Sequence, residues 1–185
     1  MSALGVDKAP DSRYARSKLN GEKAVLAAFP DAVIVRPSII FGPGDGFFGR
    51  FSRMAKISPV LPLIGDGEMK FQPVYVEDVA EAFVKILGEE RPRRIYELAG
   101  PKIYSFRELL ELMLAEMRKE RLLLPLPFPI AKLLAFFLQF SPGCPLTPDQ
   151  VQLLKYDNIL SDKNGLELLG LKPHYLETAL PDILA

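Results

Sequence analysis

The chain has 185 residues and a mass of 20.6 kDa, with 23 basic and 23 acidic side chains. Because 49% of the residues are hydrophobic and 25% are charged, a disordered chain is excluded, and the balanced charge argues against a general nucleic-acid binder. A single cysteine, Cys144, and a single histidine, His174, exclude a disulfide framework and a zinc site built from those residues, and we interpret both as loop residues.

The first third of the chain predicts a helix, a strand and a second helix. Residues Ser12 to Ala28 are mostly good helix formers. Ala32 to Val35 form a short apolar run, which is typical of a buried strand. Phe47 to Ile57 predict a second helix that ends before Pro59.

A glycine-rich loop precedes the second predicted helix. Residues 44–49 match G-x-G-x-x-G, the fingerprint of a dinucleotide-binding loop. That fingerprint needs its first glycine directly after a strand, whereas Pro37 and Pro43 lie between Arg36 and Gly44 here. We therefore interpret the segment as a loop that starts a helix, and not as a pyrophosphate site.

The middle of the chain contains extended segments and helix-start signals. Residues 58–65 are broken by Pro59 and Pro62 and predict no clean strand, whereas Lys70 to Val76 and Ile95 to Ala99 are expected to be extended. Capping-box patterns predict three helix starts. The paired positions are Asp78 with Glu81, Ser105 with Glu108, and Thr147 with Gln150.

The longest apolar stretch runs from Leu122 to Phe140. Its three early prolines and Lys132 prevent one clean membrane-spanning helix. One interpretation is a proline-stiffened connector followed by a short buried helix. The other is a helix, Ile130 to Phe140, that docks on a membrane surface or a partner, although it lacks the basic polar face that such helices favour.

Tyr14 and Lys18 form a Y-x-x-x-K motif on the first predicted helix. Their spacing of four residues puts both side chains on one face. A tyrosine ionises near pH 10, but a nearby ammonium stabilises the phenolate and lowers that pKa. The pair could then move a proton to or from a substrate hydroxyl. Taken alone, the motif is equally typical of a solvated helix face.

The order of the motifs resembles that of a known superfamily. Ser2, Tyr14-x-x-x-Lys18, Arg36-Pro37-Ser38 and the run Pro73-Val-Tyr-Val-Glu-Asp-Val-Ala80 resemble the C-terminal half of extended or atypical short-chain dehydrogenases, the NAD-dependent epimerase/dehydratase family. Within that superfamily, residues 12–18 and 72–76 are most similar to the NAD(P)H-binding accessory subunit of respiratory complex I and its bacterial relatives.

The resemblance implies an α/β chain with a partial Rossmann-type fold and a helix-rich C-terminal substrate domain. We expect residues 1–60 to be a remnant of the Rossmann domain and residues 61–185 to form the substrate or interaction domain. In the family, five strands and the glycine-rich dinucleotide loop come before the serine. Because Ser2 is the second residue here, we expect that half to be missing and the chain alone to bind no NAD(P).

The resemblance also implies roles for individual residues. Tyr14 would donate or accept the proton, Lys18 would bind the nicotinamide ribose and lower the phenol pKa, and Ser2 would orient a substrate carbonyl. The residues that would pack against the nicotinamide are Pro37, Ser38 and Ile39. The cofactor of the full-length parent would be NAD or NADP, with NADPH favoured.

Several functions remain open at this stage. The resemblance to the complex I subunit implies a structural or nucleotide-sensing role in NADH:ubiquinone oxidoreductase, and the chain alone is expected to be inactive. The alternative is a catalytic epimerase or reductase on a small or lipid-like substrate, with Tyr14 as acid or base. Many sugar-nucleotide epimerases carry an arginine where this chain has Phe71, which weakens a sugar-nucleotide substrate. A third possibility is a domain with only an interaction role.

The expected partners and location follow from these interpretations. The partners would be respiratory complex I or the membrane surface, with no nucleic acid. The location would be cytoplasmic, with peripheral attachment to the inner face of a bacterial respiratory membrane. Because the strand Ala32 to Val35 would lack its usual neighbour, we also expect the chain to self-associate.

Overall fold

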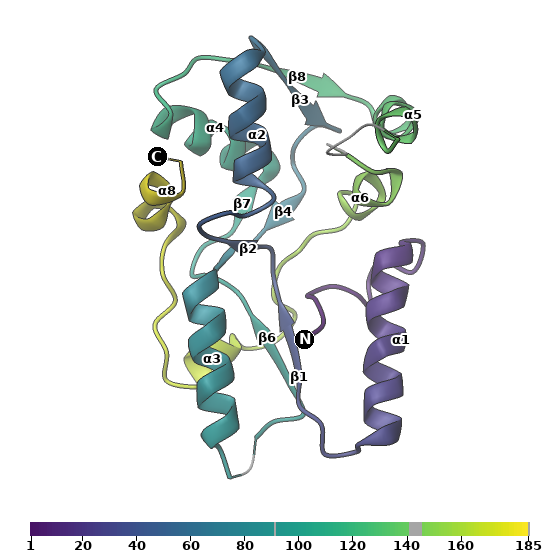
Figure 1. Cartoon of the computed structure of the whole chain (residues 1–185), viewed down its shortest axis with the longest axis vertical. Helices are drawn as coiled ribbons and strands as arrows, with labels where there is room; N and C mark the ends of the chain where they lie inside the picture. Colours follow the sequence, from purple (N-terminus) through teal and green to yellow (C-terminus); the bar gives the residue numbers. More distant parts are fainter. Residues whose placement is uncertain (91, 141–145, 185) are drawn as a thin grey trace.

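A computed structural model describes residues 1–90, 92–140 and 146–184, so Cys144 lies outside the described residues. The α/β fold class is confirmed, with more residues in helices than in strands (Figure 1). In chain order the elements are α1 Arg13–Ala28, β1 Ile34–Pro37, β2 Ile40–Phe41, α2 Phe48–Ile57, β3 Val60–Ile64, β4 Lys70–Phe71, β5 Val74–Tyr75, α3 Val76–Gly88, β6 Ile95–Leu98, β7 Tyr104–Ser105, α4 Phe106–Glu116, β8 Leu122–Leu126, α5 Phe128–Leu138, α6 Pro148–Leu153, α7 Gly165–Leu168 and α8 Leu176–Leu184.

The strands pair across long stretches of sequence. β1 pairs in parallel with β6, β2 with β5 and β3 with β8, whereas β4 and β7 are antiparallel. The first residues run beside β1, because Ser2 N donates to Val35 O at 2.7 Å and Leu4 N donates to Pro37 O at 2.8 Å. In the view of Figure 1, α1 and α3 flank β1 and β6.

The buried apolar residues form two larger clusters. The first packs α2, α4 and α8 against β3 and includes Phe48, Leu61 and Phe106. The second packs α3 and α7 against β1 and β6 and includes Val35 and Leu98. Each cluster draws on residues before and after position 60, and the expected domain boundary there stays a prediction.

Local capping explains where three of the helices begin. Ser12 is the N-cap of α1, since its Oγ accepts a hydrogen bond from Ala15 N at 3.2 Å. The predicted capping boxes of Ser105 with Glu108 and Thr147 with Gln150 are confirmed at the starts of α4 and α6. At these positions the short-range sequence pattern was sufficient to locate the helix.

The predicted cap at Asp78 is wrong. Helix α3 begins at Val76 with Tyr75 at the N-cap, and Asp78 lies in its first turn. The Asp78 carboxylate is buried and accepts a hydrogen bond from His174 N at 2.8 Å, while its other oxygen contacts the His174 ring. The Asp78 carboxylate therefore binds His174, which is distant in sequence, and does not cap the helix as the local pattern predicted.

Two strands form in segments whose prolines predicted no regular strand. β3 contains Pro62, and β8 contains Pro125 in the segment expected to be a connector. Each strand has one paired edge in the described sheet, so a missing proline N–H can face the unpaired side. The predicted strand at Ala32 to Val35 also begins later, at Ile34, and continues to Pro37.

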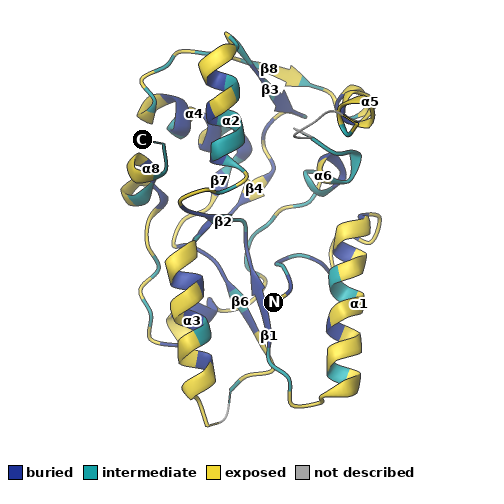
Figure 2. Ribbon diagram, viewed as in Figure 1, coloured by how far each residue is buried: buried dark blue, intermediate teal, exposed yellow. Residues whose placement is uncertain are grey.

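Helix α5 does not have the buried environment expected for it. Only Ala131 and Ala135 of this helix are buried, and Figure 2 shows α5 as mostly exposed. The prediction of a short buried helix is therefore wrong. Among the described residues, no helix has both the length and the apolar character that a membrane span requires.

Candidate functional site

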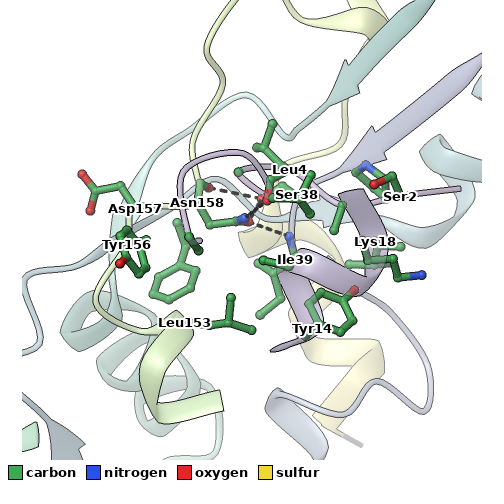
Figure 3. Close-up of a pocket in the computed structure, with 18 of the residues that line it drawn as sticks. Ser2, Leu4, Tyr14, Lys18, Ser38, Ile39, Leu153, Tyr156, Asp157 and Asn158 are labelled. Atoms are coloured by element: carbon green, nitrogen blue, oxygen red, sulfur yellow. Dashed lines mark hydrogen bonds between the residues drawn. The ribbon is translucent and has the colours of Figure 1, made fainter. Parts of the chain in front are cut away.

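All six predicted site residues line one pocket. It has a volume of about 360 Å³ and lies between the first residues, α1, the loop after β1 and residues 153–158. The predicted residues that line it are Ser2, Tyr14, Lys18, Pro37, Ser38 and Ile39. Most of its other lining residues are apolar, among them Leu4, Phe71 and Leu153 (Figure 3).

Helix α1 presents Tyr14 and Lys18 to this pocket. Tyr14 is 45% exposed, and the Lys18 ammonium lies 5.7 Å from the centre of the Tyr14 ring. Partial burial raises the pKa of Tyr14, opposite to the lowering that the resemblance implied. Burial is the cause of this rise. The acid–base role of Tyr14 stays a prediction.

Ser2 lies at the end of the strand-like segment beside β1. It is buried, and in the described part of the chain its Oγ makes no hydrogen bond of normal geometry. The hydroxyl is nevertheless close enough to the Glu22 carboxylate to help lower the pKa of that group. The Ser2 hydroxyl therefore lies between the pocket and the carboxylate that binds Arg36.

Asn158 fixes the loop that contains Ser38 and Ile39. Its Oδ1 accepts hydrogen bonds from Ser38 Oγ at 2.6 Å and from Ile39 N at 3.0 Å. Its Nδ2 donates to Leu4 O at 3.0 Å, which ties the same loop to the first residues. Sequence reasoning missed Asn158, because its partners are about 120 or more residues away and no local pattern indicates the contact.

Asp149 of α6 holds the start of α1. Its carboxylate accepts hydrogen bonds from Arg13 N at 2.7 Å, Tyr14 N at 2.9 Å and Ser12 Oγ at 3.0 Å. Burial opposes the ionisation of Asp149, but the hydrogen bonds from Tyr14 and Arg13 outweigh it and lower the pKa of the carboxyl. The helix that carries Tyr14 and Lys18 is thus anchored by a residue that sequence reasoning did not assign to the site.

A buried ion pair attaches the middle of α1 to β1. Arg36 Nε and Nη2 donate to the two carboxylate oxygens of Glu22 at 2.8 Å and 2.7 Å. Burial opposes the charge on Glu22, but the hydrogen bonds from Arg36 outweigh it, so the pKa of Glu22 is lowered. This two-point contact sets how far α1 lies from the strand that leads to Pro37.

The G-x-G-x-x-G segment forms a loop over residues 44–47, and its last two residues begin α2. Gly44 has a φ of +79°, which suits glycine, and Asp45 Oδ1 accepts hydrogen bonds from Phe47 N at 2.7 Å and Phe48 N at 2.6 Å. Asp45 therefore occupies the position that an anionic ligand would take at this helix start. This agrees with the interpretation of the segment as a loop.

Residues 6–132 match the family model of the RmlD substrate binding domain. The chain belongs to this family. Outside the masked positions, this RmlD-type domain has no group of three or more His, Cys, Asp or Glu residues that could hold a metal ion.

The RmlD-type domain also has curated relatives along its whole length. It is 39% identical over 190 residues to the mitochondrial NADH dehydrogenase (ubiquinone) 1 alpha subcomplex subunit 9 of Arabidopsis thaliana, with 96% of this chain and 47% of the relative covered. It is 31% identical to the protein of the same name from Mus musculus, with 100% of this chain and 50% of the relative covered. The chain thus spans about half the length of these relatives, and the resemblance to the complex I accessory subunit is confirmed.

Solved structures show the same fold as this RmlD-type domain. The dTDP-glucose 4,6-dehydratase of Bacillus anthracis, solved with NAD, superposes with a TM-score of 0.69 at 18% identity and covers 95% of this chain and 52% of its own. The Pseudomonas aeruginosa protein RMD, solved with NADPH, gives a TM-score of 0.64 at 21% identity over 92% of this chain and 54% of its own. The Rossmann-type fold class of the extended short-chain dehydrogenases is thereby confirmed.

Proposed function

We propose that this chain supplies the nicotinamide-facing part of an NAD(P)-binding accessory protein of NADH:ubiquinone oxidoreductase, with a structural or nucleotide-sensing role. The observation that carries the proposal is the convergence of Ser2, Tyr14, Lys18 and the loop of residues 37–39 on one pocket. The relatives that match along the whole chain, named as subunits of NADH dehydrogenase, support the choice of assembly.

The residues of the pocket fit a nicotinamide ribose. A mostly apolar space bounded by Pro37 and Ile39 suits an aromatic ring, and the Lys18 ammonium suits ribose hydroxyls. The nucleotide, when bound, supplies hydride chemistry that no side chain can supply. The half-exposed Tyr14 phenol would hold a proton beside the ring, and Ser2 Oγ would donate to a carbonyl. NAD or NADP would serve, with NADPH favoured, and neighbours of the same fold were solved with each.

Nucleotide binding by the chain alone is a direct test. In this fold class the pyrophosphate is held by the first βα turn and the helix that follows, and the resemblance assigns that turn to the half expected before Ser2. We therefore expect isothermal titration of the 185-residue chain with NADPH to give no measurable heat of binding. A dissociation constant of micromolar or tighter would show that the pocket is sufficient without that turn.

Association with the respiratory assembly is the test of the accessory role. A tagged chain, expressed in cells that contain NADH:ubiquinone oxidoreductase, is expected to comigrate with the complex on a native gel after mild detergent extraction. The control is the same tag on an unrelated domain of equal size. A chain that never enters the complex, alone or in its full-length parent, would contradict the proposal.

A catalytic role is the second candidate. The apolar lining, with Phe71 at the pocket, favours a small or lipid-like substrate over a sugar nucleotide. In that case Tyr14 would act as the acid or base, and Tyr14→Phe in the full-length parent would lower kcat at least about a hundredfold. Unchanged turnover in that variant would exclude the role of Tyr14, and absence of turnover in the parent favours the accessory role.

We propose a peripheral location to accompany the accessory role. The chain would lie on the cytoplasmic, inner face of a bacterial respiratory membrane, held there by complex I or by the membrane surface. Residues 1–60 and 61–185 would act as the nucleotide-facing and interaction parts. Separating intact membranes from the cytoplasm and washing them with high salt or carbonate tests this location, because a peripheral protein is released by the wash.

A further inference from the structure

Helix α5 exposes a broad apolar face. The residues Ile130, Leu133, Leu134, Phe136 and Phe137 are between 45% and 65% exposed. At 100° per residue they cover roughly 160° of the helix, which matches the apolar stripe of an amphipathic helix. Beyond the helix, Phe140 is 75% exposed and packs its ring edgewise against Phe136, with centroids 5.9 Å apart. The outward face of α5 is therefore a continuous aromatic and aliphatic surface.

Among the described residues, those that cover α5 lie on the opposite side of the helix. Ala131 and Ala135 are fully buried there, and the helix packs against α6. Two alanines on the inner side and large apolar residues on the outer side reverse the usual arrangement of a surface helix. Such a face is typical of a helix that meets an apolar environment outside its own chain.

A charged cavity, lined by three cations and two carboxylates, flanks the apolar face. It has a volume of about 370 Å³ and is lined by Lys132 and Phe136 of α5 together with Arg13 and Arg16 of α1. At the start of α5, outside the cavity lining, the Lys155 ammonium lies 5.7 Å from the centre of the Phe128 ring. Positive groups from two helices that are far apart in sequence thus surround one edge of α5.

The acidic residues of the cavity are engaged by other groups. Asp149 accepts three hydrogen bonds from residues 12–14, and Asp11 accepts hydrogen bonds from Tyr156 Oη and Gln152 Nε2. By contrast, Lys132 makes no ion pair with any residue that the structure describes. Arg16 Nη1 donates to Pro10 O at 3.4 Å, and Arg13 is close enough to Asp149 to help lower the pKa of that carboxyl. Lys132, beside the apolar face, is therefore the cation of the cavity that is most available to an anion.

We propose that α5 docks on an anionic phospholipid bilayer, with a headgroup phosphate between Arg13, Arg16 and Lys132. The inference rests on the proposed peripheral location and specifies the contact. Apolar side chains would enter the interfacial region while the cations meet the phosphates. The objection that the helix lacks a basic face is removed, because α1 supplies the missing charges. A second copy is a poorer occupant, since a two-fold contact would bring the same cations together.

Vesicle binding tests the proposal. The chain is sedimented with vesicles of phosphatidylcholine alone or of phosphatidylcholine mixed with phosphatidylglycerol. We expect binding to the anionic vesicles at least about tenfold tighter than to the neutral ones, because each cation near the surface adds attraction to anionic lipid. The difference should shrink as salt is raised, since salt screens that attraction.

Matched variants locate the contact on the protein. Phe137→Ser removes apolar area, and the double variant Arg16→Gln/Lys132→Gln removes cavity charge; each is expected to weaken binding to anionic vesicles about tenfold or more. Leu87→Ser changes an equally apolar residue that is 86% exposed on α3, and Lys56→Gln/Lys85→Gln removes two exposed charges elsewhere. These controls should bind as the unchanged chain does.

Three outcomes would overturn the inference, and they can be told apart. If the chain binds vesicles, but Phe137→Ser and Arg16→Gln/Lys132→Gln bind them as well as the unchanged chain does, the contact lies elsewhere and the peripheral location survives. If the chain binds no vesicles of either kind, the membrane contact fails while the complex I test remains decisive for the proposed function. If Phe137→Ser leaves vesicle binding intact and turns a dimer into a monomer by light scattering, the face binds a second copy. Circular dichroism checks that each variant is folded. If Phe137→Ser does not fold, Leu133→Ser replaces it in the vesicle experiment.

Discussion

Single polar side chains determine the geometry of the pocket. Asn158 is the clearest case, because one amide group joins the Ser38–Ile39 loop to Leu4 through three hydrogen bonds. The Asn158 backbone also pairs with the segment around Phe71, since Asn158 N donates to Lys70 O and Asn158 O accepts from Gln72 N. The Ser38–Ile39 loop is therefore held by a residue that the family motifs do not include.

Replacement of Asn158 should destabilise the chain. In Asn158→Ala, the Ile39 amide and the Leu4 carbonyl lose their partner in a partly buried position. We expect the free energy of unfolding in urea to fall by about 2–3 kcal/mol. Asn20→Ala, at an exposed position on α1, is the matched control and should change it by less than about 0.5 kcal/mol. Equal stabilities of the two variants would contradict the role given to Asn158.

The Glu22–Arg36 pair predicts how stability depends on pH. Because the folded-state pKa of Glu22 is lowered, its contribution is present above the unfolded value and is lost as the pH falls through the folded value. Glu22→Gln should lower the free energy of unfolding by about 1–3 kcal/mol at neutral pH. The loss stays moderate because Arg36 keeps Asp7 at 3.2 Å and Glu97 at 4.0 Å.

Urea unfolding at neutral pH and at successively lower pH measures this effect. The difference between Glu22→Gln and the unchanged chain should shrink at the acidic end, where Glu22 becomes protonated in both folded and unfolded states. A difference that grows on acidification would have the wrong sign for a lowered pKa and would refute the assignment.

At the scale of elements, α1 is held by polar contacts to two other elements, β1 and α6. Asp149 of α6 binds its first turn, and Arg36 of β1 binds its middle through Glu22. Few apolar residues of α1 are buried, Ala15 being the buried one within the helix. Polar contacts therefore hold α1 against the rest of the protein, whereas most helices are held by a buried hydrophobic face.

Loss of the Asp149 contacts should loosen the start of α1. In Asp149→Ala, the amides of Arg13 and Tyr14 lose a charged acceptor, so their hydrogen exchange should accelerate at least about tenfold. Asp31→Ala, at an exposed turn position, is the control and should leave these amides unchanged. If both variants exchange alike, α1 is anchored without Asp149.

The extent of sequence prediction differs between elements for physical reasons. The starts of α4 and α6 were predictable because Ser105 and Thr147 bond within their own first turns. The start of α3 was not, because Asp78 is engaged by His174, 96 residues away. The pocket follows the same rule: the family motifs located Tyr14 and Lys18, whereas Asn158 and Asp149 act through long-range contacts that no local pattern indicates.

At the scale of the whole molecule, β1 lies between β6 and the first residues. β6 pairs with one side of this strand, and residues 2–4 lie along the other side through hydrogen bonds to the carbonyls of Val35 and Pro37. In the part of the chain that the structure describes, no further strand joins this two-stranded pairing. A sheet this narrow has edges that favour pairing with another chain.

We therefore expect the chain to self-associate. Light scattering should give a mass of at least two chains at high concentration and a lower mass on dilution, as expected for a reversible contact. The Phe137→Ser variant should behave in the same way, because its face is assigned to lipid. A monomer across the whole concentration range would count against the expectation.

The long-range strand pairings have a consequence for the order of folding. β1 pairs with β6 and β3 with β8, so each pairing must first close a loop of roughly 60 residues. Helices capped within their own first turns need no such closure and form early, whereas sheets dominated by distant contacts form slowly. The pocket requires Leu4 and Asn158 to meet across 154 residues, which makes it among the last regions to assemble. A newly made chain would thus carry its exposed α5 face before its pocket is complete.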